Sequence, residues 1–175
     1  MMLPQLQALT HAQHQQRVLD HCVAFEADLD VTQQLFSPYR IRPLGAHIDH
    51  QLGRVASIAT NQGITVTFSP NPNRRLRAQS AGFGPIADVR IGTPQSAQGD
   101  WADYLRGSAA VLDQTDFPAG LDISVAGYLG EVGLSSSAAV TLAYLRALLS
   151  AAGAPPDPAR LIQWSQKVEN EFLGL

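Results

Sequence analysis

LDISVAGYLGEVGLSSSAAVTLAYLRALLSAAG, residues 121–153, shows the clearest change of pattern in the chain. The segment from Leu121 to Tyr128 is short and apolar, which is typical of a buried strand. Spaced glycines and a serine triplet follow, and then a long apolar run ends near Gly153, which predicts a helix. The order of strand, glycine-serine turn and helix indicates a domain that mixes α and β structure.

The glycine-serine turn has the composition of an anion-binding site. Gly130 and Gly133 admit backbone conformations and close approaches that a side chain would block. Ser135, Ser136 and Ser137 fall at the start of the predicted helix, where free N–H groups and the helix dipole favour a phosphate. The turn is not a Walker loop, because no Gly-Lys-Ser/Thr follows it. The alternative is simple serine capping of a buried helix.

A second polar stretch, YRIRPLGAHIDHQLG, runs from Tyr39 to Gly53. It gathers two arginines, two histidines and an aspartate around glycines. His47, Asp49 and His50 offer the side chains of a transition-metal site. On a strand, however, residues 47 and 49 would share a face while residue 50 points away, which makes three ligands from one strand awkward. Contacts to a polar small molecule are the alternative.

The rest of the chain alternates between helix and strand patterns. A helix is expected from Leu6 to Leu29, with His14 and His21 on its polar surface rather than in a metal site. Another should follow Asp100 as its cap, and a last one should begin with Asp157 and Pro158 and run to Leu173. Further strands are expected at Tyr39 to Leu44, Val55 to Thr60, Ile64 to Ser69, Arg74 to Gln79 and Ala87 to Ile91.

Composition excludes several classes of protein. The chain has 175 residues, 45% apolar and 15% charged, which fits one globular domain. Its net charge of −3 gives no basic surface for nucleic acid. Apolar runs are too short for a membrane helix and no secretory signal is recognisable, so a cytoplasmic location is expected. The single cysteine, Cys22, cannot form an internal disulfide.

The two polar stretches together resemble the motifs of a known family. GLSSSAA, with the preceding LDISVAGYLG, is similar to the phosphate-binding motif of the GHMP small-molecule kinases, and most of all to the galactokinase branch. YRIRPLGAHIDHQLG is similar to the sugar-binding signature of that branch. WADYLRG and VENEFLGL lie in the matching order.

This resemblance implies an α+β fold, the ribosomal-protein-like two-layer fold of the GHMP kinase N-terminal domain, in which helices cover a mostly antiparallel sheet. It divides the chain into an N-terminal helical segment, 1–36, and a GHMP kinase N-terminal domain, 37–175. That domain is expected to be incomplete at its C-terminal end, with the C-terminal GHMP domain absent. The general base of the family would lie beyond Leu175, so this chain is expected to be inactive alone.

The resemblance also implies ATP-dependent phosphorylation of the anomeric hydroxyl of a sugar. Arg40 matches the arginine that stabilises the reacting centre, and His47 and Asp49 match sugar contacts. Ser137, with Ser136 as the near alternative, and Glu169 match the groups that hold Mg²⁺, a suitable hard-oxygen pair. Without the motif, Glu169 would be interpreted as a solvated helix charge. The implied nucleotide-binding residues are Gly130, Gly133, Leu134, Ser135, Ser136 and Ser137.

Ala46 is the departure that indicates the substrate. Galactokinases carry a glutamate here that contacts the C6 hydroxyl of the sugar, and alanine removes both its charge and its volume. A carboxylate at C6 then becomes acceptable, and the whole stretch resembles the galacturonokinases more closely, which phosphorylate D-galacturonic acid at C1. Arg42 could supply positive charge near this acid, because strand alternation places it on the same face as Arg40.

Other functions remain open. A galactokinase or an arabinokinase would differ only in substrate, and a non-catalytic regulator that binds sugar and ATP would lack turnover. The expected partners are a sugar or sugar acid, ATP and Mg²⁺, with no nucleic acid and no membrane. A homodimer is also expected, formed through apolar surface that truncation would expose.

Overall fold

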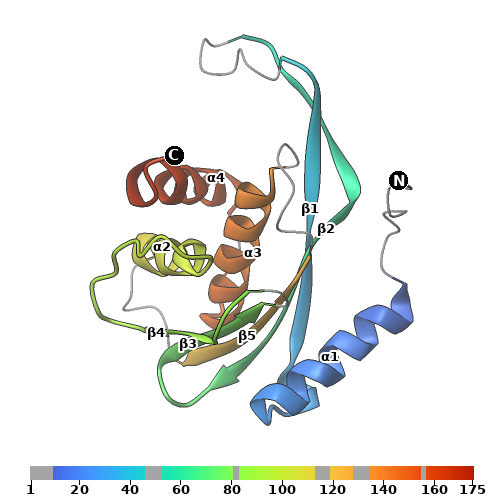
Figure 1. The fold of residues 1–175 in the computed structure, drawn as a ribbon, viewed down its shortest axis with the longest axis vertical. Coiled ribbons are helices and arrows are strands. Elements are labelled where there is room, and N and C mark those ends of the chain that lie inside the picture. Colours follow the sequence, from blue (N-terminus) through green and yellow to red (C-terminus); the bar gives the residue numbers. More distant parts are fainter. Residues whose placement is uncertain (1–9, 46–52, 81–82, 113–118, 128–134, 155–156) are drawn as a thin grey trace.

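The computed structural model describes residues 10–45, 53–80, 83–112, 119–127, 135–154 and 157–175 (Figure 1). His47, Asp49, Ala46 and the segment 128–134 lie outside these ranges. Within them, no helix combines the length and the apolar character needed to cross a bilayer.

A five-stranded sheet forms the centre of the fold, in the order β1-β2-β5-β3-β4. Every neighbouring pair is antiparallel except β3 and β5, which run parallel. β2 and β5 place Val66 opposite Val125 and Phe68 opposite Ile123. The strands are β1 (Gln33–Leu44), β2 (Ala56–Asn71), β3 (Arg75–Ser80), β4 (Ala87–Arg90) and β5 (Gly120–Ala126).

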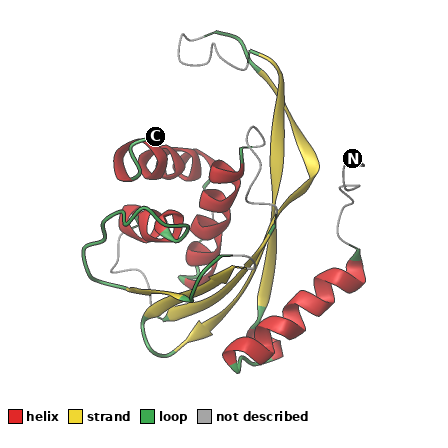
Figure 2. Ribbon diagram, in the orientation of Figure 1, coloured by secondary structure: helices red, strands yellow, loops and turns green. Residues whose placement is uncertain are grey.

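Helices cover both faces of this sheet (Figure 2). On one face lie α2 (Asp103–Val111), α3 (Ser136–Ala151) and α4 (Pro158–Lys167), and α4 continues into a π-helical turn, η4 (Val168–Phe172). On the other face lies α1 (His11–Phe25), followed by the short 3₁₀ helix η1 (Leu29–Val31). The predicted α+β fold with a mostly antiparallel, helix-covered sheet is confirmed.

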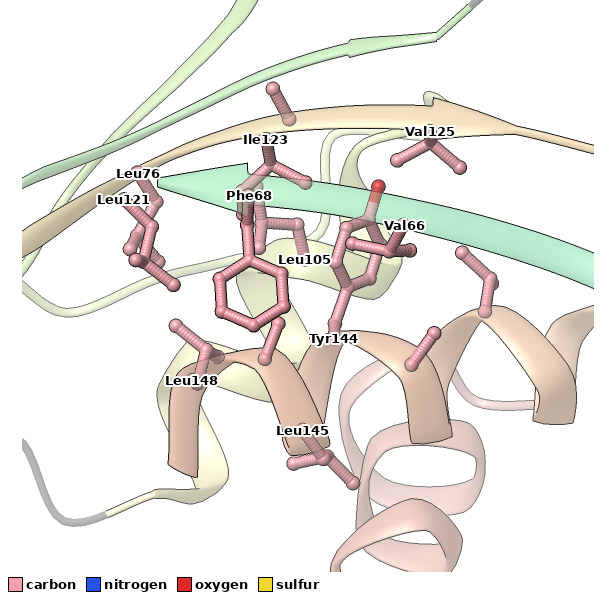
Figure 3. Close-up of a cluster of buried hydrophobic side chains, with 14 of the residues drawn as sticks. Val66, Phe68, Leu76, Leu105, Leu121, Ile123, Val125, Tyr144, Leu145 and Leu148 are labelled. Carbon is pink, nitrogen blue, oxygen red and sulfur yellow. The ribbon is translucent and has the colours of Figure 1, made fainter. Parts of the chain in front are cut away.

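The apolar core lies between the sheet and α3 (Figure 3). Val66, Phe68 and Ile123 point from β2 and β5 toward Tyr144 and Leu148 of α3. Each of these side chains is at most 3% exposed. Alternation along the strands sends the neighbouring residues to the opposite face, and those neighbours are polar.

Hydrogen bonds between polar side chains join α1 to the sheet, next to the buried ring of Phe25. His21 has no exposed surface, and its Nδ1 and Nε2 atoms lie 2.9 Å and 3.0 Å from the hydroxyl oxygens of Ser124 and Ser69. His14 Nδ1 lies 2.9 Å from Gln34 Oε1. The expectation that His21 lies on the polar surface of its helix was therefore wrong, because the sheet face beneath α1 is itself polar.

β2 is one long strand rather than the two expected segments. Asn61, Gln62 and Gly63 look like a turn in the sequence, yet Gly63 pairs with Pro38 across a register shift in β1. A Cβ at Gly63 would come within 2.1 Å of the Ser37 carbonyl oxygen. Glycine is therefore required by the close approach of two strands. The expected boundary between residues 36 and 37 falls inside β1, and the division of the chain stays a prediction.

β1 and β2 extend together beyond the rest of the sheet as a two-stranded ribbon (Figure 1). Its apolar side chains remain in solvent, including Ile41, Leu44, Val55 and Ile58. Residues 39–44, within the described first part of the polar stretch, belong to this ribbon.

Candidate functional site

Arg40 joins the two polar stretches that the sequence singles out. Arg40 is part of β1, and its Nε donates a hydrogen bond of 2.8 Å to Ser135 Oγ at the start of α3. The two residues are 95 positions apart in the chain. The structure therefore brings the predicted catalytic arginine and the predicted phosphate-binding serines together.

Ser135 holds an unusual backbone conformation. It is the N-cap residue of α3 with φ 55° and ψ 44°, a left-handed conformation that costs free energy for any residue except glycine. Its side chain makes no capping hydrogen bond to the helix, since the hydroxyl faces Arg40. The expected alternative, serine capping of a buried helix, does not describe Ser135.

The backbone N–H groups in the first turn of α3 have no acceptor within the helix. The first helical bond at this end runs from Ala139 N to Ser135 O at 3.1 Å. Ser136 and Ser137 occupy the first two helical positions, whose N–H groups have no acceptor within an α-helix. These donors and the positive end of the helix dipole suit an anion.

A small cavity opens beside this turn. Its volume is about 110 Å³. Phe83 and Trp101, whose ring centroids lie 6.2 Å apart, line it together with the half-buried Tyr104. Four residues of α3 complete the lining: Ser136, Ser137, Val140 and Tyr144. Aromatic and apolar walls next to backbone donors suit a flat ring that carries a phosphate chain.

Ion pairs shape the loop that presents Trp101. Arg106 donates hydrogen bonds to Asp100 Oδ1 at 2.6 Å and to Asp103 Oδ1 at 2.5 Å. Asp103 in turn accepts hydrogen bonds from the backbone of Gln98 and Gly99. The hydrogen bond from Arg106 lowers the pKa of Asp100, against the effect of burial. α2 begins at Asp103 with Ala102 at its N-cap, so the expectation that Asp100 caps it was wrong.

Glu169 lies in η4, a π-helical turn of the kind often found at functional sites. η4 packs closely on α2, because a Cβ at Gly107 would come within 2.8 Å of Val168 Cγ1 and 2.9 Å of Phe172 Cδ1. Burial raises the pKa of the Tyr104 phenol, and the negative charges of Glu169 and Asp103 raise it further. Glu169 thus acts on a side chain that lines the cavity.

No cluster of three or more His, Cys, Asp or Glu side chains that could hold a metal ion occurs among the residues with a described placement. A cation beside Ser137 and Glu169 would therefore draw few ligands from the protein. Mg²⁺ tolerates such a site, since it commonly keeps several waters and takes phosphate oxygens as ligands. The magnesium-binding roles of Ser137 and Glu169 stay predictions.

Arg42 lies two positions after Arg40 on β1, and both side chains are half-buried while Ile41 between them is exposed. Register shifts occur on either side of Arg40 and Ile41, so the ribbon twists here and its side chains are redirected. The role of Arg42 toward an acidic substrate stays a prediction.

Several predicted site residues fall outside the described part of the chain. These are the sugar-contact residues Ala46, His47 and Asp49, and the nucleotide-binding residues Gly130, Gly133 and Leu134. The alternative metal site at His47, Asp49 and His50 lies outside it as well. Their roles stay predictions.

Sequence reasoning did not assign Phe83, Trp101 and Tyr104 to the site. WADYLRG was recognised only as a motif in the matching order, and no role was given to its aromatic residues. The available signal in the sequence was that two aromatic residues, Trp101 and Tyr104, lie in one short segment with two aspartates and an arginine.

Comparisons with known proteins agree with this arrangement. Residues 103–175 match the family described as GHMP kinases N terminal domain. The galacturonokinase of Arabidopsis thaliana is 34% identical over 162 residues, which cover 79% of this chain. A galactokinase of Lacticaseibacillus casei is 32% identical over 145 residues, which cover 80% of this chain. In both comparisons the chain spans 38% of the length of the relative.

The fold has counterparts among solved structures. The galactokinase of Lactococcus lactis in complex with galactose superposes with a TM-score of 0.84 at 23% identity, covering 93% of this chain and 43% of that one. The mevalonate kinase of Methanococcus jannaschii superposes with a TM-score of 0.70 at 17% identity, covering 81% of this chain and 47% of that one. The shared fold, the family match and the two relatives together show that this chain belongs to the GHMP kinases, as an N-terminal domain similar to those of galactokinases and galacturonokinase.

Proposed function

We propose that this domain forms the sugar- and ATP-binding part of a sugar-1-kinase whose substrate is D-galacturonic acid. The hydrogen bond between Arg40 and Ser135 is the observation that carries the proposal. It connects the stretch that resembles a sugar signature with the stretch that resembles a phosphate-binding motif. A sugar hydroxyl and a γ-phosphate would meet between them.

ATP would bind across the start of α3. The adenine ring would lie in the aromatic cavity formed by Phe83, Trp101 and Tyr104, and the phosphates would lie at the N-terminus of α3, beside Ser136 and Ser137. Gly130, Gly133 and Leu134 would contribute from the segment before the helix.

Arg40 would act at the reacting centre. In phosphoryl transfer the C1 oxygen of the sugar forms a bond to the γ-phosphorus while the bond from phosphorus to the β-bridging oxygen breaks, and the hydroxyl proton passes to a general base. Negative charge spreads over the γ-phosphoryl oxygens, and a guanidinium can donate two parallel hydrogen bonds to them. Ser135 holds Arg40 toward that position.

Ser137 and Glu169 fit a magnesium ion because a hydroxyl and a carboxylate are hard oxygen ligands. When bound, Mg²⁺ neutralises charge on the β- and γ-phosphate oxygens. Burial raises the pKa of the Tyr104 phenol, and the charge of Glu169 raises it further, so Glu169 is electrostatically coupled to a side chain that lines the cavity.

The substrate assignment depends on Ala46. A glutamate at this position would repel a C6 carboxylate at short range, whereas alanine leaves room for it. Arg42 would add an attractive charge. His47 and Asp49 would hydrogen-bond to the ring hydroxyls.

The test is calorimetric titration of the chain with D-galacturonate, D-galactose and L-arabinose, each with and without a non-hydrolysable ATP analogue and Mg²⁺. We expect galacturonate to bind most tightly. Tighter binding of galactose or arabinose would change the proposed substrate but leave the proposed sugar-kinase function in place. No binding of any sugar would overturn the proposal.

The Ala46→Glu variant tests the substrate assignment directly. Charge repulsion at short range should weaken galacturonate binding by about tenfold or more, while galactose binding should hold or improve. Gln51→Glu is the matched control, because it adds the same charge five positions away in the same stretch. Unchanged galacturonate affinity in Ala46→Glu would remove the specificity argument.

Self-association through the ribbon is a further part of the proposal. Ile58 and Leu44 are 56% and 64% exposed, and such apolar surface favours contact with a second copy. Gel filtration over a hundredfold range of concentration should show a shift toward a dimer, which Ile58→Lys should abolish. A monomer at every concentration would contradict it.

A further inference from the structure

α1 lies on the face of the sheet opposite α3 (Figure 1). A cavity with both polar and apolar lining lies between α1 and the strands. Its volume is about 400 Å³, within the range of small-molecule sites. It runs beneath the middle of α1 to the ends of β3 and β5. Its lining combines the apolar Val125 and Ala126 with the polar residues Arg17, Asp20, His21, Thr67, Gln79, Ser80 and Ser124.

Arg17 is the unusual member of this lining. Its Nη1 atom is fully buried and has no hydrogen-bond partner within the described parts of the chain. Burial lowers the pKa of its guanidinium, although an arginine keeps its charge at neutral pH. More than nine-tenths of buried polar groups in proteins have a partner, and a charged group without one costs free energy. A donor with this cost is expected to serve a ligand.

The neighbouring polar groups are largely engaged with one another. Ser124 Oγ accepts a hydrogen bond of 2.9 Å from Gln79 Nε2 and lies 2.9 Å from His21 Nδ1. Burial lowers the pKa of His21 despite the charge of Asp122, so the imidazole is neutral at pH 7. Arg17 is therefore the cation that faces this cavity.

The two carboxylates near the cavity, Asp122 and Asp20, each accept hydrogen bonds from neighbouring side chains. The Asp122 carboxylate is held by Arg77 through bonds of 2.6 Å and 2.7 Å and receives a third from Asn71. Asp20 is exposed at the rim, where it accepts a hydrogen bond of 2.8 Å from Gln16. Asp20 can accept further hydrogen bonds from hydroxyl groups that reach the rim.

We propose that this cavity is a second ligand site, separate from the nucleotide site, for a small polyhydroxylated molecule that carries a carboxylate or a phosphate. The anionic group would pair with Arg17, and hydroxyl groups would bond to Asp20 at the rim and to Ser80 and Gln79 inside. A guanidinium forms two parallel hydrogen bonds with either anion, so the same site accepts both chemistries.

The test is an amide NMR titration of the ¹⁵N-labelled full chain with sodium gluconate and, separately, with inorganic phosphate. Sodium chloride at matched ionic strength serves as the reference, and saturating ADP with Mg²⁺ occupies the other candidate site. We expect saturable shifts at Gln79, Ser80 and Ser124. A response to gluconate alone assigns a carboxylate ligand, and a response to phosphate alone assigns a phosphate ester.

Arg17→Gln should raise the dissociation constant about tenfold or more, because it removes a charge-assisted bidentate contact. Without ligand it should unfold at the same temperature as the wild type or a higher one, since it removes an unpartnered buried cation. Arg17→Lys keeps the charge without the planar fork and should bind at intermediate strength. Arg90→Gln, an exposed arginine on β4, is the control and should bind normally.

Two results would overturn the proposal. One is the absence of saturable shifts at Gln79, Ser80 and Ser124 in the wild type with either probe. The other is equal affinity in the wild type, Arg17→Gln and Arg17→Lys.

Discussion

The two faces of the central sheet differ in chemistry although the same strands supply both. Toward α3, β2 and β5 present Val66, Phe68 and Ile123, which are buried against apolar side chains. Toward α1, the same two strands present Ser69 and Ser124, which bond to His21. One face therefore contributes stability mainly through apolar burial, while the other joins α1 through directional hydrogen bonds beside the buried Phe25 and leaves a cavity.

The difference predicts that the same substitution has unequal effects on the two sides. Leu148→Ala in α3 should lower the free energy of unfolding by about 2–5 kcal/mol, because the side chain has no exposed surface. Leu19→Ala in α1 should cost less than about 1 kcal/mol, since that side chain is 49% exposed. Urea denaturation followed by far-ultraviolet circular dichroism measures both. Equal losses would contradict the comparison.

A smaller effect tests the hydrogen-bonded side. His21→Leu should cost about 1–3 kcal/mol, because it leaves the fully buried Ser69 hydroxyl without its partner. Adding Ser69→Ala should recover part of the loss, as both ends of the bond are then apolar. His11→Leu, an exposed position of the same helix, is the control. If the double variant is less stable than His21→Leu, the hydrogen bond does not hold α1 in this way.

The smallest expected effect is a pH dependence. Burial lowers the pKa of His21 in the folded chain below its ordinary value of about 6.5. As the pH falls below that value the unfolded chain binds a proton first, so stability should decrease, and this loss ends once the folded imidazole is also protonated. Unfolding free energies measured between pH 7.5 and 5 should fall more steeply in the wild type than in His21→Leu. Parallel profiles would show that His21 does not titrate in this range.

Much of the apolar side of the fold follows from the sequence. The alternation in Ile64 to Ser69 and the apolar run after Ser137 are local signals, and they correctly predict the second half of β2 and the helix α3. The Asp157 cap is confirmed too, since its Oδ1 accepts a hydrogen bond of 3.0 Å from Ala159 N. Hydrophobic periodicity and helix capping depend only on residues that are close in sequence, so both can be recognised without the fold.

The polar side was harder to predict because its signals are not local. A histidine in a glutamine-rich helix looks like surface, and only the polar face of the sheet makes a buried place for His21. The parallel pairing of β3 with β5 and the continuity of β2 past Gly63 also depend on strands that meet across the chain.

The motif resemblance singled out Arg40 and Ser135, and the hydrogen bond between them shows that these two residues lie together. Their roles in a site stay predictions. The aromatic cavity was missed, since Phe83, Trp101 and Tyr104 converge through folding and through the ion pairs of Arg106 rather than through spacing.

The central claim is that the two polar stretches form one site for a sugar acid and a nucleotide. The most direct measurement is an amide NMR titration with D-galacturonate followed by ADP and Mg²⁺, observing Arg40 and residues 135–137. We predict that galacturonate shifts the Arg40 signals, that ADP shifts those of Ser135, Ser136 and Ser137, and that each ligand changes the apparent affinity of the other. Saturable binding of both ligands without shifts at these four residues would contradict the account.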